Sequence, residues 1–161
     1  MSGQLPNHPL MGKFDLDPGS TRPYWYGVEI DVPVEAGSSG VGSINLLNQP
    51  FIWTRTTHAI VGCTGFPDTT GLNQDGQYTI AFQDEQTQYQ NIPIMAEAMF
   101  GTTRAGDSIW MPYPIPFAGN KTITFKVTNR CTRVLSPVSE TFTVQIALSG
   151  FVDLGRARPQ R

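Results

Sequence analysis

Cysteine, lysine and histidine are scarce in this sequence, and their scarcity excludes several kinds of site. The 161 residues include two Cys, three Lys and two His. Cys63 and Cys131 have no second cysteine or histidine at the spacing of a metal site. We therefore expect two reduced, partly buried thiols, with a disulfide as the alternative, and neither a metal nor a cofactor.

Positive charge and long apolar runs are also lacking. The formal net charge is −2 and the isoelectric point is about 5.6, whereas nucleic-acid binding depends on many Lys and Arg side chains on one face. The first residues have neither the basic start nor the apolar run of about 7–15 residues that a secretory signal needs, and no segment is long and apolar enough to span a membrane. Nucleic acid and membrane are therefore not expected as partners.

Glycine, proline and threonine are abundant instead. The chain has 16 Gly, 13 Pro and 17 Thr, and these residues favour turns and strands over helices. Apolar and polar residues alternate with the period of a strand over 24–32, 77–82, 122–127 and 141–148. Seven or eight such strands with long connections predict an all-β fold, a two-sheet antiparallel sandwich of the jelly-roll or Greek-key type.

The chain divides into three parts. Residues 1–23 carry four Pro and three Gly and predict an extended N-terminal arm, residues 24–152 the sandwich, and residues 153–161 a basic C-terminal tail. The arm is richer in apolar residues than a freely solvated segment needs, so we expect it to lie along a surface, with a disordered terminus as the alternative. The apolar residues that could contact a partner are Leu5, Leu10, Met11 and Phe14.

Two segments depart from simple alternation. Ile94–Ala105 holds a short run of helix formers, but Gly101 and two Thr interrupt it, so we expect a strand, with a helix as the alternative. Pro112, Pro114 and Pro116 alternate with apolar residues, and this pattern predicts an extended, polyproline-like crossing outside the sheets.

Nothing in the sequence provides the groups that catalysis requires. His8 lies in the arm, and His58 lies in a strand segment on its polar side, where a surface position or a satisfied hydrogen-bonding role is the simpler explanation. Asp84 and Glu85 are adjacent, and neighbours in a strand point to opposite faces, so we assign them to the end of a hairpin. The chain is not expected to be an enzyme.

Two features could bind a partner. Trp25 falls on the polar side of the first strand, beside Glu29 and Asp31, so we expect an exposed ring, whereas Trp53 is expected to fill the core. Trp110 is a second candidate ring. The tail carries Arg156, Arg158 and Arg161, so it is a further candidate for contact with an acidic partner or nucleic acid, with a solvated terminus as the alternative.

The stretch from Pro50 to Phe151 resembles small virion proteins of tailed bacteriophages. The resemblance rests on the segments "QPFIW", "YTIAFQD", "NIPI…MFG", "MPYPIPFAGNKTITFKVTN" and "ALSGF". It implies a β-sandwich that serves as a head decoration or minor capsid protein, or as part of a head fibre, neck or tail.

The same resemblance implies where such a protein acts and what it contacts. The expected location is the virion, after assembly in the host cytoplasm. The expected partners are the major capsid protein or other virion proteins, together with further copies of this chain in a dimer or trimer. The alternative function is a carbohydrate- or receptor-binding module of a phage tail or fibre.

Overall fold

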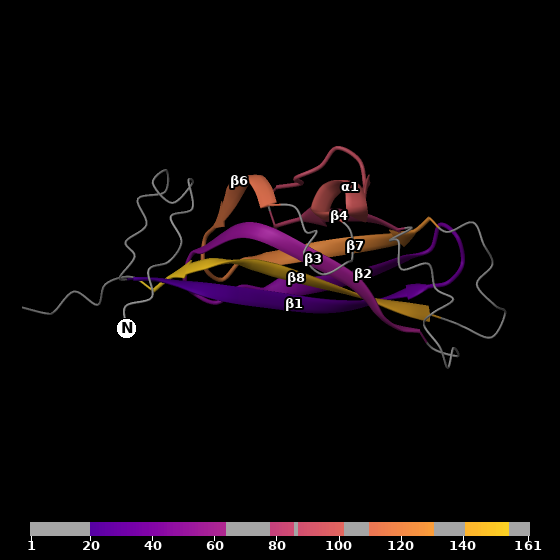
Figure 1. Cartoon of the computed structure of the whole chain (residues 1–161), viewed down its shortest axis with the longest axis horizontal. Coiled ribbons are helices and arrows are strands. Elements are labelled where there is room, and N and C mark those ends of the chain that lie inside the picture. Colours follow the sequence, from indigo (N-terminus) through magenta and orange to yellow (C-terminus); the bar gives the residue numbers. More distant parts are fainter. Residues whose placement is uncertain (1–19, 64–77, 86, 102–109, 131–140, 155–161) are drawn as a thin grey trace, which may run out of the picture.

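The residues that the structure describes form eight strands and one short helix. The computed structural model describes residues 20–63, 78–85, 87–101, 110–130 and 141–154, with the backbone alone for residues 63 and 110–113. The elements are β1 (Thr21–Pro33), β2 (Ser39–Asn45), β3 (Phe51–Cys63), β4 (Tyr78–Gln83), β5 (Ile94–Met95), α1 (Ala96–Phe100), β6 (Trp110–Phe117), β7 (Thr122–Asn129) and β8 (Thr141–Asp153). Figure 1 shows the three long strands β1, β3 and β8 running side by side.

The order of the strands in the two sheets identifies the topology. Sheet A has the order β1-β8-β3-β6 and sheet B the order β2-β7-β4-β5. Each strand of the first half pairs antiparallel with its counterpart in the second half: β1 with β8, β2 with β7, β3 with β6, and β4 with β5. A long hairpin rolled into two sheets gives this arrangement, which is a jelly roll. The predicted all-β, two-sheet antiparallel sandwich is confirmed.

β1 and β8 form one unbroken antiparallel ladder. Its register runs from Thr21 opposite Asp153 to Pro33 opposite Thr141. Buried and more accessible residues alternate along all of β8, because one face of the sheet covers the core and the other faces outward. β1 begins at Thr21, three residues before the sequence-based boundary at Tyr24.

β3 changes its inward face part of the way along. Its register with β8 shifts between Trp53 and Arg55, which leaves Thr54 as an extra, bulged residue. Trp53 faces the core before this bulge, and Thr56 and His58 face it beyond the bulge. The prediction that His58 lies on the polar side of the strand was therefore wrong, because one inserted residue exchanges the two faces.

The proline-rich segment is part of a sheet. Residues 110–117 form β6, whose register with β3 places Phe117 opposite Phe51 and Trp110 opposite Arg55. The expectation of a crossing outside the sheets was wrong. A proline has no N–H to donate, and β6 tolerates three of them because it is an edge strand that needs hydrogen bonds on one side only.

The segment that begins at Ile94 is a strand for only two residues. β5 ends at Met95, and α1 follows over Ala96–Phe100. Ala96 and Phe100 lie four residues apart on one helix face and are both buried, so packing favours a single helical turn over the predicted longer strand. The turn ends at Gly101, whose φ of 88° and ψ of −177° suit a residue without a Cβ.

Aromatic side chains fill the space between the sheets. Trp53 is fully buried, as predicted, and contacts Phe82 edge to face with ring centroids 4.9 Å apart. Its Nε1 donates to Thr56 Oγ1 at 2.7 Å and to the Arg55 carbonyl oxygen at 3.1 Å. The apolar core is continuous through both sheets, so the described part of the sandwich interior is packing and not a ligand chamber.

Candidate functional site

The buried histidine of the core is held by two hydrogen bonds. His58 is 4% exposed, with Nδ1 2.6 Å from the Tyr78 hydroxyl and Nε2 2.8 Å from the Gly101 carbonyl oxygen. A carbonyl oxygen can only accept, so Nε2 carries the proton and Nδ1 accepts from the Tyr78 O–H. His58 therefore connects β3, β4 and the residue that ends α1.

The environment of His58 favours its neutral form. Burial lowers the pKa of His58, while the hydrogen bond to the Gly101 carbonyl and the charge of Glu97 act in the opposite direction. Burial also raises the pKa of Tyr78, with a further contribution from Glu97. A neutral imidazole with both nitrogens engaged inside the core stabilises the fold and has no free nitrogen for proton transfer to a substrate.

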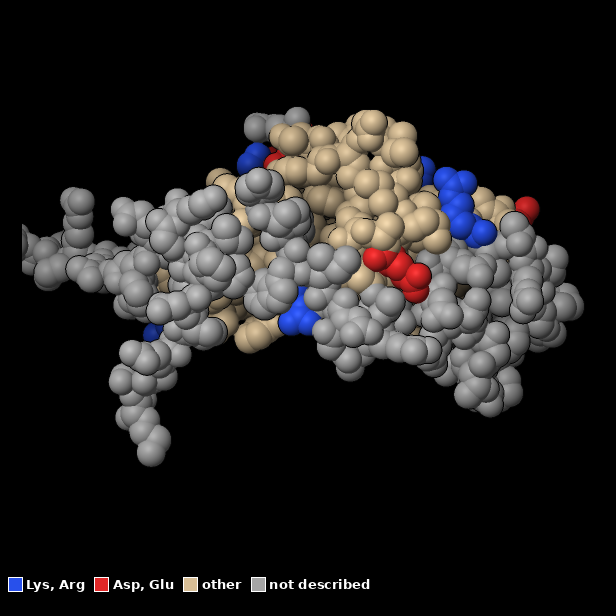
Figure 2. Space-filling view, turned by 45° about the horizontal axis from the view of Figure 1, so that its top comes forward, with Lys and Arg blue, Asp and Glu red and all other residues tan. Residues whose placement is uncertain are grey.

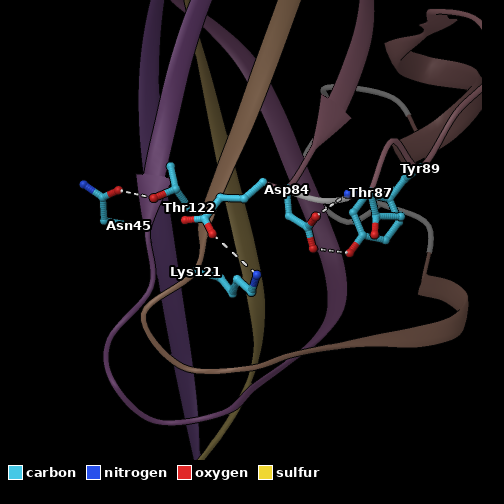
Figure 3. Close-up of polar contacts among 7 residues, drawn as sticks. Asn45, Asp84, Thr87, Tyr89, Lys121 and Thr122 are labelled. Atoms are coloured by element: carbon cyan, nitrogen blue, oxygen red, sulfur yellow. Dashed lines mark hydrogen bonds and ion pairs between the residues drawn. The ribbon is translucent and has the colours of Figure 1, made fainter.

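The acidic pair at the end of β4 belongs to a turn, as predicted. Asp84 Oδ1 accepts from the Thr87 N–H at 2.6 Å, and Asp84 Oδ2 accepts from the Tyr89 hydroxyl at 3.0 Å (Figure 3). Glu85 forms an ion pair with Lys121 across 3.5 Å. The two carboxylates serve separate structural contacts, so they do not form an acid and base pair around one bond.

Among the described residues, no group of three or more His, Cys, Asp or Glu side chains could hold a metal ion. The described residues contain no helix with the length and apolar character that a membrane span requires. On the face drawn in Figure 2, acidic and basic side chains are few and do not gather in a patch of one sign.

The outer face of sheet A carries the most exposed aromatic ring of the described chain. We define the Trp25 face as eight outward positions in the middle of the β1–β8 ladder, which are Trp25, Gly27, Glu29, Asp31, Thr143, Gln145, Ala147 and Ser149. Trp25 is 65% exposed, as its position in the alternating pattern predicted. On the same side of the ladder, Trp25 lies between Pro23 and Gly27, opposite Ser149 and diagonal to Phe151.

One row of residues crosses all four strands of sheet A at the level of Trp25. Trp25 is opposite Ser149, Ser149 is opposite Arg55, and Arg55 is opposite Trp110. The register thus places the two predicted tryptophans in the same row, one on each edge strand. For Trp110 only the backbone position is described. Sequence reasoning did not single out Arg55 and Ser149, because the bulge at Thr54 hides their alignment.

The first and last described residues of the chain lie together at one end of sheet A. Thr21 is opposite Asp153, and the Leu154 N–H donates to the Ser20 carbonyl oxygen at 2.9 Å. Residues 1–19 and 155–161 are therefore attached side by side, four residues of β1 away from Trp25. The predicted contact residues of these segments lie outside the described residues: Leu5, Leu10, Met11, Phe14, Arg156, Arg158 and Arg161.

Comparisons of this chain with protein-family models, with curated protein sequences and with solved structures gave no match.

Proposed function

We propose that this chain is a non-enzymatic structural component of a bacteriophage particle, a head decoration or minor capsid protein that binds the capsid lattice and self-associates. The observation that carries the proposal is the arrangement at one end of sheet A. There the exposed Trp25 lies close to the point where the arm and the tail are both attached.

The fold supports this proposal without deciding it. Jelly rolls build viral capsid proteins and lectins, but one fold hosts many functions, so the surface must carry the argument. The described interior is packed with apolar side chains, and its histidine has both nitrogens engaged. Contact with other proteins through outer surfaces is the function that this arrangement suits best.

A large exposed aromatic ring on a rigid strand suits the centre of a protein interface. Tryptophan side chains are frequent among the residues that contribute most of the binding free energy, because they bury a large area with few rotatable bonds. Trp25 lies within β1, and the residues before and after it in this strand are paired with residues of β8. On a particle, the expected partner is the major capsid protein or another virion protein.

Deletion of residues 2–19 tests the role of the arm. The deletion leaves β1 complete, since the strand begins at Thr21. We expect the truncated protein to keep the unfolding curve of the full chain and to be lost from particles purified by sedimentation. Full retention of the truncated protein on particles would contradict a binding role for the arm.

The exposure of Trp25 also favours one alternative, a carbohydrate- or receptor-binding module of a phage tail or fibre. Sugar rings stack on flat aromatic side chains, and the polar side chains of Glu29 and Gln145 are on the same face. Binding of the full chain to an array of glycans, lost on Trp25→Ala and kept after deletion of residues 2–19, would favour this alternative over the capsid proposal.

A further inference from the structure

The Trp25 face carries two carboxylates that lack a cationic partner in the described structure. Glu29 Oε1 accepts from Gln145 Nε2 at 3.2 Å, and Asp31 Oδ1 accepts from Thr143 Oγ1 at 2.6 Å. Both donors are neutral, and the ion pair found among the described residues involves neither carboxylate. The face therefore presents an exposed ring and two negative charges along one strand.

The basic segment of the same chain has the complementary composition. Residues 155–161 contain Arg156, Arg158 and Arg161 and no acidic residue. Arginine forms bidentate hydrogen bonds with carboxylates and stacks its planar guanidinium on tryptophan rings. An arginine-rich segment thus matches both features of the Trp25 face.

Arg156 and Arg158 cannot reach the two carboxylates of their own chain. It is attached at Leu154, beside Ser20, and Arg156 and Arg158 lie at most about 7 and 14 Å further along an extended chain. Glu29 and Asp31 lie nine and eleven residues along β1 from Ser20, which corresponds to about 30 and 36 Å. Pairing of these two arginines with Glu29 and Asp31 therefore requires a second copy.

The spacing of the charges agrees with such a contact. Glu29 and Asp31 are two residues apart on one side of a strand, about 7 Å, and Arg156 and Arg158 have the same separation in an extended segment. In an antiparallel arrangement Arg156 is level with Asp31 and Arg158 with Glu29. Arg161 is then level with Tyr26, one residue from Trp25.

We propose that the Trp25 face binds residues 155–161 of a second copy of this chain, in a two-fold dimer in which each copy donates its basic segment to the other. This inference rests on the proposed function, because it names a partner for the same face. A two-fold axis makes the contact self-complementary, so the exchange closes at two chains.

Charge reversal on the full-length protein tests the proposal. The tail-reversed variant carries R156E, R158E and R161E, and the face-reversed variant carries E29K and D31K. We expect the wild type to form dimers in sedimentation velocity, more weakly at high salt. Each reversed variant alone should bind itself about tenfold or more weakly than the wild type does.

A mixture of the two variants provides the decisive result. In a heterodimer of the tail-reversed and face-reversed chains, both contacts again join opposite charges, so the mixture should dimerise more tightly than either variant does alone. The milder variant with E29Q and D31N should also weaken the dimer, and urea unfolding checks that each variant is folded. A mixture that stays monomeric, or a wild type without dimers, would overturn the proposal.

Failure of this inference can be distinguished from failure of the proposed function. Loss of the dimer with normal binding to particles would remove this inference and leave the capsid proposal intact. A dimer restored by mixing, in a protein that never associates with particles, would remove the capsid proposal and leave the dimer contact in place.

Discussion

At the level of single residues, the buried imidazole of His58 couples the stability of the fold to pH. Its Nε2 donates to Gly101 and its Nδ1 accepts from Tyr78, an arrangement that only the neutral tautomer provides. Protonation would place a positive charge in the core and leave two donors on the ring. The core therefore disfavours the charged form, in agreement with the lowered pKa of His58.

We expect the free energy of unfolding to fall as the pH is lowered from about 7 to about 5. The unfolded chain takes up a proton near the ordinary histidine pKa of about 6.5, whereas folded His58 takes it up only at lower pH. The contribution to stability is complete above about pH 6.5 and is lost as the pH falls through the folded pKa. For this one group, the free energy of unfolding changes by at most about 1.4 kcal/mol per pH unit.

Urea unfolding of the wild type and of His58→Gln over this pH range measures the effect. The glutamine variant keeps an amide that can donate and accept but does not titrate, and it retains His8, so the difference between the two profiles reports His58 alone. Parallel profiles would show that His58 is not the group responsible.

Tyr89 gives a second residue-level prediction. Burial, together with the hydrogen bond to Asp84 and its negative charge, raises the pKa of Tyr89 to about 12. Replacement of Asp84 by Ala should lower this pKa toward 10 without reaching it, because burial is the largest cause and remains. The absorbance of tyrosinate during an alkaline titration measures the shift. Glu85→Ala is the matched control, and an equal shift in this variant would contradict the assignment to Asp84.

At the level of elements, Gly150 of β8 shows how closely the strands approach. A Cβ at this position would collide with the backbone carbonyl oxygen of Ile52 on β3, whereas a Cβ at Gly27 would meet only the Ile146 carbonyl oxygen at 4.0 Å. Both glycines lie in sheet A, one facing the core and one facing outward. They form a matched pair for the same substitution.

Gly150→Ala should lower the free energy of unfolding by about 3 kcal/mol, because two backbones must separate to admit the methyl group. Gly27→Ala should raise stability by up to about 1 kcal/mol, since alanine restricts the unfolded chain more than glycine does. Thermal or urea unfolding of the two variants compares them directly. Equal effects at both positions would contradict the close approach of β8 and β3.

The sequence predicted the strands with regular alternation well and the irregular ones poorly. The outward position of Trp25 and the buried position of Trp53 followed from alternation. The inward position of His58 did not, because the bulge at Thr54 depends on pairing with β8, far away in the sequence. The edge position of β6 depends likewise on its neighbour β3, which the local proline pattern does not reveal.

The candidate site was predictable residue by residue but not as an arrangement. Exposure of Trp25 and the charge of residues 155–161 are local properties. The contact between Ser20 and Leu154, which places the attachment points of residues 1–19 and 155–161 side by side, is a property of the jelly roll. Pairing between the first and last strands brings residues more than 130 positions apart to the same end of one sheet.

At the level of the whole molecule, the interior of the jelly roll and its outer surface have separate roles. The described interior is filled by a continuous apolar core, so among the described residues a partner can contact outer faces and strand edges but not the space between the sheets. In our proposal the Trp25 face is the binding surface and the rest of the sandwich holds it rigid.

The most direct test of the Trp25 face as the binding surface is the affinity for purified phage particles. It is measured for full-length protein carrying Trp25→Ala or Val41→Ala. Val41 is the matched control, because it is 64% exposed but lies on sheet B. We predict that Trp25→Ala weakens binding by about 30-fold, as expected for a central interface tryptophan, while Val41→Ala changes it by less than about twofold. Equal binding by the wild type and both variants would contradict the central claim.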